Sequence, residues 1–237
     1  MKNFHSFLLT AVCLLCFSAG MSAEEVTKTF AVPSDYKALN VSSALTVTYS
    51  EDATEMTVYA DSDDIENFEF KCEGATVSIS LKSKKILRLA KISSPVRVVI
   101  PSSKSLEILN ISGASKFTAE KVIDVIDLSV DVSGSSSFTG EVSAVDMDIY
   151  CSGTSSVNIS GEADEVSYNV SGASRVGSNE ACLVCEEAKV SVSSASSLWL
   201  EASDKITGHV SGASKVTYSG ECTVSVGSTG ASAVNKK

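Results

Sequence analysis

Several residue types that enzymes and membrane proteins depend on are scarce in this chain of 237 residues. It has two histidines, three prolines and one tryptophan, and aromatic residues make up 6% of it. The longest apolar run, at residues 7–17, has roughly 11 residues, whereas a membrane-spanning helix needs ~20. His209 is the only histidine beyond residue 23, so a Ser-His-acid triad or a zinc site has few candidate members. We therefore expect no metal, no cofactor and no transmembrane segment in the mature chain.

Basic residues are also scarce relative to acidic residues. The 19 Lys and Arg residues are outnumbered by 29 Asp and Glu residues, which leaves a formal net charge of −10. Proteins that bind nucleic acids or anionic membranes use clustered basic side chains to displace counterions from phosphate groups. The sequence shows no long basic run, so neither is expected as a partner.

Five cysteines lie beyond residue 23: Cys72, Cys151, Cys182, Cys185 and Cys222. An odd number leaves at least one thiol unpaired in a monomer. The Cys-x-x-Cys spacing of Cys182 and Cys185 occurs in zinc sites, in redox pairs and in local disulfides. A zinc site lacks its other ligands here and no helix is expected after the motif, so ordinary structural cysteines are the favoured interpretation.

Residues 1–23 have the pattern of a secretory signal peptide. Lys2 provides the positive start and the apolar run follows. Small residues come next, at Ser18, Ala19, Gly20, Ser22 and Ala23. The bulky residues before Cys13 and Cys16 do not suit cleavage as a bacterial lipoprotein. The sequence thus predicts export to the periplasm or the cell surface.

A short motif close to Ser-Gly-Ala-Ser recurs along the second half of the chain. The second residue of the motif recurs every 18 to 22 residues, at Gly113, Gly134, Gly153, Gly172, Ser194, Gly212 and Gly230. Glycine suits a sharp corner there, because it readily adopts a positive φ. The second residue after this position is serine in every copy: Ser115, Ser136, Ser155, Ser174, Ser196, Ser214 and Ser232. Repeats of this length leave no room for a helix and indicate stacked β-coils that bury their apolar sides on one another.

The residues before each corner alternate between apolar and polar. In one copy Leu128, Val130 and Val132 are expected to point inward, with the residues between them in solvent. The repeated serines would then stack at the strand spacing of ~4.8 Å and form a structural hydrogen-bonded ladder. We predict an all-β solenoid at residues 104–237. An irregular β-rich region at residues 24–103 is expected to cap the stack.

The motif Val/Ile-Ser-Gly-Ala-Ser-Lys/Arg-Val/Phe, at residues 111–117, 170–176 and 210–216, resembles that of a known family. It is similar to the putative auto-transporter adhesin, head GIN domain family of exported bacterial proteins, over the chain from about Tyr36 onward. The resemblance implies a right-handed parallel β-helix, here of about seven to eight coils, and export in Gram-negative bacteria. It supplies no catalytic residues. Ser194, in place of glycine, departs from the motif and puts the tight corner geometry of the fifth copy in question.

Two functions compete on the sequence. The first is an exported, non-catalytic adhesin-like or structural module that presents a repetitive face to a glycan, a protein or the cell envelope. The alternative is a polysaccharide lyase or hydrolase on a β-helix scaffold. Such an enzyme needs two facing carboxylates, for which Asp127 with Asp131, or Asp146 with Asp148, are the candidates. The acids are frequent and no long loop walls a cleft, so the interaction module is favoured.

Trp199 is the candidate binding residue. It follows the inward Leu198, so alternation turns it outward among small polar residues. An exposed indole offers a flat apolar surface on which a sugar ring or a partner side chain can stack. Tyr150, also outward, is a possible helper. The alternative for Trp199 is that it folds over the coil edge and shields the corner at Ser194.

The signal peptide gives a testable start for the mature protein. When the protein is purified from its native host, we expect its N-terminus between Met21 and Glu24, because the small residues there suit signal peptidase. N-terminal sequencing checks this. A chain that begins at Met1, or at a lipidated cysteine, would contradict the proposed export route.

Overall fold

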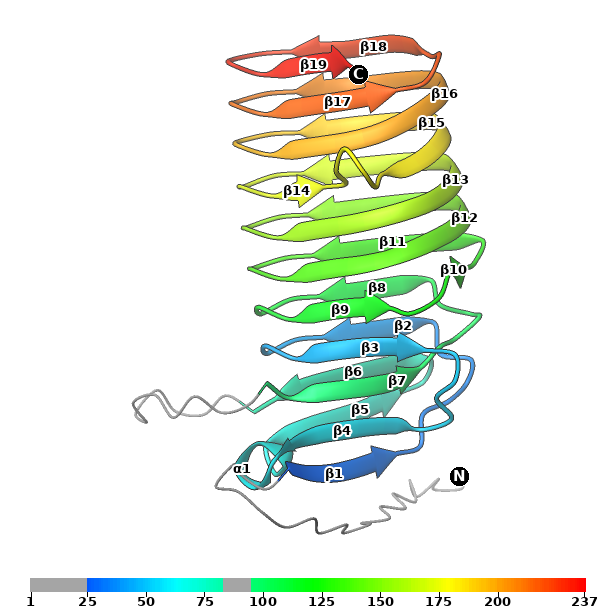
Figure 1. Cartoon of the computed structure of the whole chain (residues 1–237), viewed down its shortest axis with the longest axis vertical. Coiled ribbons are helices and arrows are strands. Elements are labelled where there is room, and N and C mark those ends of the chain that lie inside the picture. Colours follow the sequence, from blue (N-terminus) through cyan, green and yellow to red (C-terminus); the bar gives the residue numbers. More distant parts are fainter. Residues whose placement is uncertain (1–24, 83–94) are drawn as a thin grey trace, which may run out of the picture.

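The computed structural model describes residues 25–82 and 95–237. The predicted signal peptide lies outside the described residues. Within these two ranges, no helix combines the length and the apolar character needed to cross a membrane. Figure 1 shows a tall stack of flattened coils, with the N-terminal strands at one end and the C-terminal strands at the other.

The described chain forms one 19-stranded sheet and one short helix. The strands of the repeat region are β8 (Ile108–Ile111), β9 (Lys116–Ala119), β10 (Ile123–Asp124), β11 (Asp127–Val132), β12 (Ser137–Cys151), β13 (Ser156–Val170), β14 (Arg175–Val176), β15 (Leu183–Val192), β16 (Ser197–Val210), β17 (Lys215–Ser219), β18 (Thr223–Ser228) and β19 (Ala233–Lys236). Neighbouring coils pair in parallel and in register, for example β12 with β13. The predicted all-β solenoid is confirmed.

Each coil of the repeat region has one sharp corner, and on the opposite side the chain either bends smoothly or forms a loop, as it does between β14 and β15. The Ser-Gly-Ala-Ser motifs form the sharp corners, and the long strands β12, β13 and β16 pass round the opposite side without a break (Figure 1). We call the strands that follow a sharp corner the near wall and those that precede it the far wall. From each sharp corner the chain runs along the near wall, turns at the opposite side and returns along the far wall to the next corner. Because the stack rises from the N-terminal to the C-terminal strands, this path makes the solenoid right-handed (Figure 1).

The interior consists of stacked columns of apolar side chains. On the far wall, Val130, Ile149, Tyr168 and Val190 oppose one another in successive coils, and all are buried. On the near wall, the rings of Phe117 and Phe138 stack with their centroids 5.8 Å apart. One coil has no core by itself, so each column stabilises the stack only through its neighbours.

The N-terminal region closes the lower end of the stack (Figure 1). Its elements are β1 (Glu25–Phe30), β2 (Ala38–Val41), β3 (Thr46–Ser50), β4 (Met56–Asp61), α1 (Ser62–Ile65), β5 (Phe68–Glu73), β6 (Thr76–Leu81) and β7 (Arg97–Pro101). The coil of β2 and β3 lies between β6 and β7 on one side and β8 and β9 on the other, all in parallel. Below it, β4 pairs antiparallel with β1 and β7, and β5 pairs antiparallel with β6. These antiparallel pairs end the pattern of parallel coils. The predicted irregular β-rich cap is confirmed, and it also contains the short helix α1.

The inward columns generate a stability prediction. Val130 and Val190 are 0% and 1% exposed, whereas Ser129 is half-buried and Lys189 is exposed. Replacing either valine by Asp places an unpaired charge in the core and should lower the free energy of unfolding by about 3–5 kcal/mol. Ser129→Asp and Lys189→Asp are the matched controls and should change it by less than about 1 kcal/mol. Urea unfolding of the four variants measures the difference, and equal losses in both pairs would contradict the register.

Candidate functional site

The sharp corners align as a ladder of their own. The N–H groups of Thr154 and Ala173 donate to the carbonyl oxygens of Gly134 and Gly153, the corner glycines of the coil below. Gly153 has a φ of +77°, and a Cβ atom there would lie 2.4 Å from the Gly134 oxygen. Glycine is therefore required both by the conformation and by the close approach of two backbones. Ser194 keeps the same conformation, with a φ of +71°, at a cost of about 1 kcal/mol.

The repeated serines lie just inside this corner. Ser232 in the last coil is half-buried. The other six are buried: Ser115, Ser136, Ser155, Ser174, Ser196 and Ser214. Their hydroxyl groups bond to the backbone rather than to one another. The N–H of Ser115 donates to Oγ of Ser136 at 3.2 Å, and the N–H of Ser136 donates to Oγ of Ser155 at 3.3 Å. Buried hydroxyls engaged in this way are structural groups, not accessible nucleophiles.

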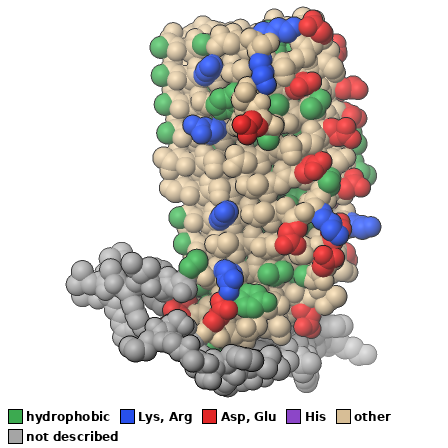
Figure 2. Space-filling model, viewed as in Figure 1, with side chains coloured by type: hydrophobic (Ala, Val, Ile, Leu, Met, Phe, Trp, Pro, Cys, Tyr) green, Lys and Arg blue, Asp and Glu red, His purple; other side chains and the backbone are tan. Residues whose placement is uncertain are grey.

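The near wall carries a line of cations that we call the basic column: Arg97, Lys116, Arg175 and Lys215. Thr46, Ser137, Ser156 and Ser197 fill the places between them in the same column. Lys116, Arg175 and Lys215 are exposed, whereas Arg97 is paired with Glu25 in the cap. Figure 2 shows scattered Lys and Arg side chains on a largely uncharged face, with most of the acidic side chains along one edge.

Trp199 lies in the next outward column of the near wall. It is half-buried, and the guanidinium carbon of Arg175 is 6.0 Å from its ring centroid. Below it, Gly177 has no side chain, and a Cβ there would lie 2.7 Å from the Trp199 carbonyl oxygen. Above it lies Thr217, whose hydroxyl oxygen is buried and has no hydrogen-bond partner among the described residues. The indole is thus held between neighbouring coils with part of its surface open.

The structure does not bring Tyr150 to Trp199. Tyr150 is 42% exposed, but it lies on the far wall between Asp131 and Asn169. Trp199 lies on the near wall, where its column neighbour is Thr217. The two side chains therefore cannot contribute to one flat surface.

Several acids line a groove on the far wall, which we call the acidic groove. It has a volume of about 420 Å³ and is lined by Glu107, Asp127, Leu128, Ser129, Asp146, Met147, Asp148, Glu165 and Ser167. Asp127 is directly beside Asp146, and Asp146 is beside Glu165. These carboxylates project in the same direction from adjacent strands of one sheet, instead of facing one another across a cleft. Asp131 also lies on this wall but does not line the groove, and partial burial raises its pKa.

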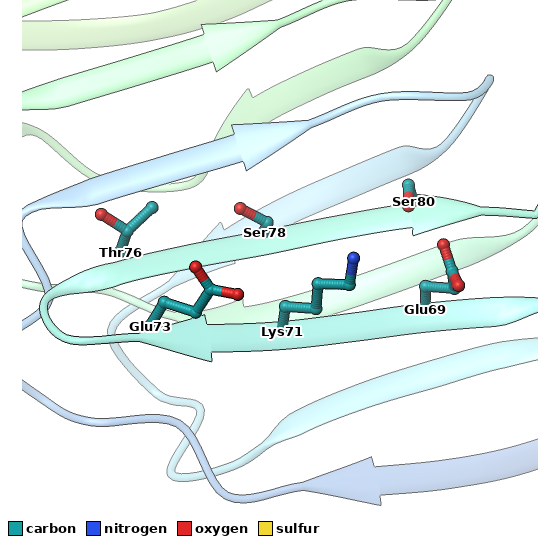
Figure 3. A pocket seen from close by; sticks show the side chains of 6 residues that line it. All are labelled: Glu69, Lys71, Glu73, Thr76, Ser78 and Ser80. Carbon is teal, nitrogen blue, oxygen red and sulfur yellow. The ribbon is translucent and has the colours of Figure 1, made fainter.

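A second, smaller groove lies on the N-terminal hairpin. It has a volume of about 300 Å³ and is shown in Figure 3. Glu69, Lys71 and Glu73 project from β5, with Thr76, Ser78 and Ser80 along β6. Lys71 separates the two acids, and Oγ of Ser78 accepts a hydrogen bond from Asn40. This arrangement fits an ordinary polar hairpin surface.

The two buried cysteines are not reactive thiols. All five in the described ranges are free thiols. Burial raises the pKa of Cys151 to about 11 and that of Cys185 to about 12, so both remain protonated and weakly nucleophilic at neutral pH. Residues 25–82 and 95–237 contain no group of three or more His, Cys, Asp or Glu side chains placed to hold a metal ion.

The basic column was missed by reasoning from the sequence, although a signal for it was present. Lys116, Arg175 and Lys215 each follow the repeated serine of their motif. They are far apart in the chain, so they form no basic run. Only the registered stacking of the coils places them in one line.

Comparison with known proteins gives a family and a fold. The family model of the putative auto-transporter adhesin, head GIN domain matches residues 35–222. No curated protein sequence matches the chain. Among solved structures, a putative adhesin from Bacteroides fragilis has a TM-score of 0.80 at 17% identity and covers 91% of this chain and 98% of its own.

Two proteins from Parabacteroides distasonis are also similar in structure. A putative adhesin has a TM-score of 0.67 at 19% identity and covers 91% of this chain and 98% of its own. A protein described as a putative lipid binding protein has the same TM-score and identity, and covers 90% of this chain and 96% of its own. At these identities the likeness concerns the fold.

Proposed function

The chain belongs to the putative auto-transporter adhesin, head GIN domain family, and from this membership we propose that it is an exported, non-catalytic interaction module. Its near wall presents a binding face to a partner outside the cytoplasm. The family description implies export and adhesion, which agrees with the signal-peptide pattern of residues 1–23.

One observation carries this proposal. Trp199 presents part of its ring on a wall whose two outward columns nearest the corner otherwise hold small, polar or basic side chains. The Arg175 guanidinium lies over the ring, and Gly177 allows the backbone of the neighbouring coil to approach Trp199 closely. Rigid aromatic side chains of this kind often anchor binding surfaces, because they lose little conformational entropy on binding.

The test is a binding screen with a matched control. The mature protein is screened against immobilised glycans, host and bacterial envelope fractions, and lipid vesicles. We expect Trp199→Ala to weaken binding by about 2 kcal/mol or more, as for an interface anchor. Tyr150→Ala removes an exposed aromatic ring from the far wall and should leave binding unchanged. If Trp199→Ala retains full binding to every ligand found, the near wall is not the binding face.

A polysaccharide-acting enzyme is the second candidate, and the acidic groove is the observation in its favour. Retaining glycosidases place two carboxyl groups about 5 Å apart and inverting ones about 6.5–9.5 Å apart, on either side of the scissile bond. Acids in one column of a parallel sheet are separated by ~4.8 Å but lie side by side. They cannot protonate one face of a sugar and attack the other.

A direct assay separates the enzyme from the binding module. We expect the mature protein to release no reducing or unsaturated sugar ends from a panel of neutral and acidic polysaccharides. Asp146→Asn is the control, because it alters the centre of the acidic groove and leaves the near wall intact. A wild-type activity that this variant lowers by at least about a hundredfold would establish the enzyme instead.

A further inference from the structure

The near wall differs in charge from the rest of the protein. The two outward columns nearest the corner, followed from Lys116 to Ala233 and from Thr118 to Asn235, contain no acidic residue, whereas the next outward column contains Glu141 and Glu201. The whole chain nevertheless has a formal net charge of −10. The acids are gathered elsewhere, as Figure 2 shows along one edge. Such segregation leaves the two columns nearest the corner as a locally positive strip on an acidic protein.

The three exposed cations of this strip have no acidic partner of their own. Lys116, Arg175 and Lys215 form no ion pair within the described residues, whereas Arg97, Lys205 and Lys236 do. The guanidinium carbon of Arg175 lies 6.0 Å from the centroid of the Trp199 ring. Unpaired cations beside an aromatic ring remain free to bind anionic groups of a ligand.

We infer that the near wall binds an acidic polysaccharide laid along the solenoid axis. This inference rests on the proposed function and adds the chemical class of the ligand. Arg175 and Lys215 are two coils apart, roughly 10 Å at the strand spacing, and Lys116 is three coils below Arg175, roughly 14 Å. Cations repeated at such intervals fit a chain with carboxylates along its length better than a small anion.

The column beside the cations fits the rest of a sugar chain. Trp199 offers an apolar ring surface for the C–H face of a pyranose. The same column contains Asn158 and Asn235, both exposed, and the half-buried Thr118 and Thr139. Their amide and hydroxyl groups can donate to and accept from sugar hydroxyls.

A nucleic acid is a weaker fit to the same strip. Single-stranded nucleic acids are bound by several aromatic rings on which successive bases stack, within a strongly positive groove. The two outward columns hold one aromatic residue, Trp199, between Lys116 and Asn235. Three unpaired cations also provide little counterion release against a net charge of −10.

The experiment compares two polymers that differ mainly in charge. The mature protein is titrated with polygalacturonate and with the same polymer after full methyl esterification, at low ionic strength. We expect polygalacturonate to bind about tenfold more tightly, because three exposed ion pairs contribute a modest amount each. Added salt should remove the difference. A single-stranded DNA oligonucleotide serves as the third probe and should bind more weakly than polygalacturonate.

Two triple variants, matched in the charge that they remove, test whether the acidic polymer binds on the near wall. Lys116→Gln, Arg175→Gln and Lys215→Gln together should abolish the preference for the charged polymer. Lys71→Gln, Lys104→Gln and Lys189→Gln remove the same charge from exposed sites outside the two columns and should retain it. Melting temperatures of both triple variants close to that of the unsubstituted chain verify that each is folded.

The outcomes separate this inference from the proposed function. Equal binding of both polymers, or DNA binding as tight as that of polygalacturonate, overturns the acidic polysaccharide. If polygalacturonate does not bind but another ligand binds in a Trp199-dependent way, the inference fails and the proposed function stands. If no ligand of the screen depends on Trp199, both fail.

Discussion

The fold depends on the close stacking of one sharp corner on the next. At Gly134, Gly153, Gly172 and Ser194 the backbone turns with a positive φ, and the carbonyl oxygen accepts a hydrogen bond from the coil above, as Gly134 does from Thr154. The same oxygen lies 2.4 Å from the place that a Cβ of Gly153 would take. The buried serine beside each corner then binds backbone N–H groups that the turn leaves free, as Oγ of Ser136 does for Ser115. Together these contacts fix the vertical register of every coil, because a slipped corner would leave buried N–H groups unpaired.

Register at the corners determines what the walls can display. With the corners aligned, the residues that flank each corner fall into columns, and on the two walls these columns alternate between the core and the solvent. A residue type repeated once per coil becomes a continuous stripe, as the buried valines and phenylalanines show. The near wall becomes a flat, rigid surface on which Trp199 and the cations keep fixed separations. A surface organised in this way is suited to extended ligands that span several coils.

The sequence was sufficient for the parts of this fold that repeat. Period-2 alternation before each glycine predicted the inward columns, and all of Leu128, Val130 and Val132 are buried. It was insufficient where contacts do not follow chain order. The coil of β2 and β3 lies between strands that come later in the chain, and no local pattern predicts such an insertion. The separation of Tyr150 from Trp199 was missed because alternation shows that a side chain faces solvent, not which wall it lies on.

Like charges are spaced differently on the two walls. In the basic column, one or two uncharged residues separate successive cations, as Ser197 separates Arg175 from Lys215. On the far wall Asp127, Asp146 and Glu165 are immediate neighbours, although like charges directly opposite one another destabilise a sheet. The stack tolerates this because these carboxylates are exposed and the hydrophobic columns beneath them are continuous. An acidic far wall repels anionic ligands, so an anionic partner of the kind we propose would bind on the near wall.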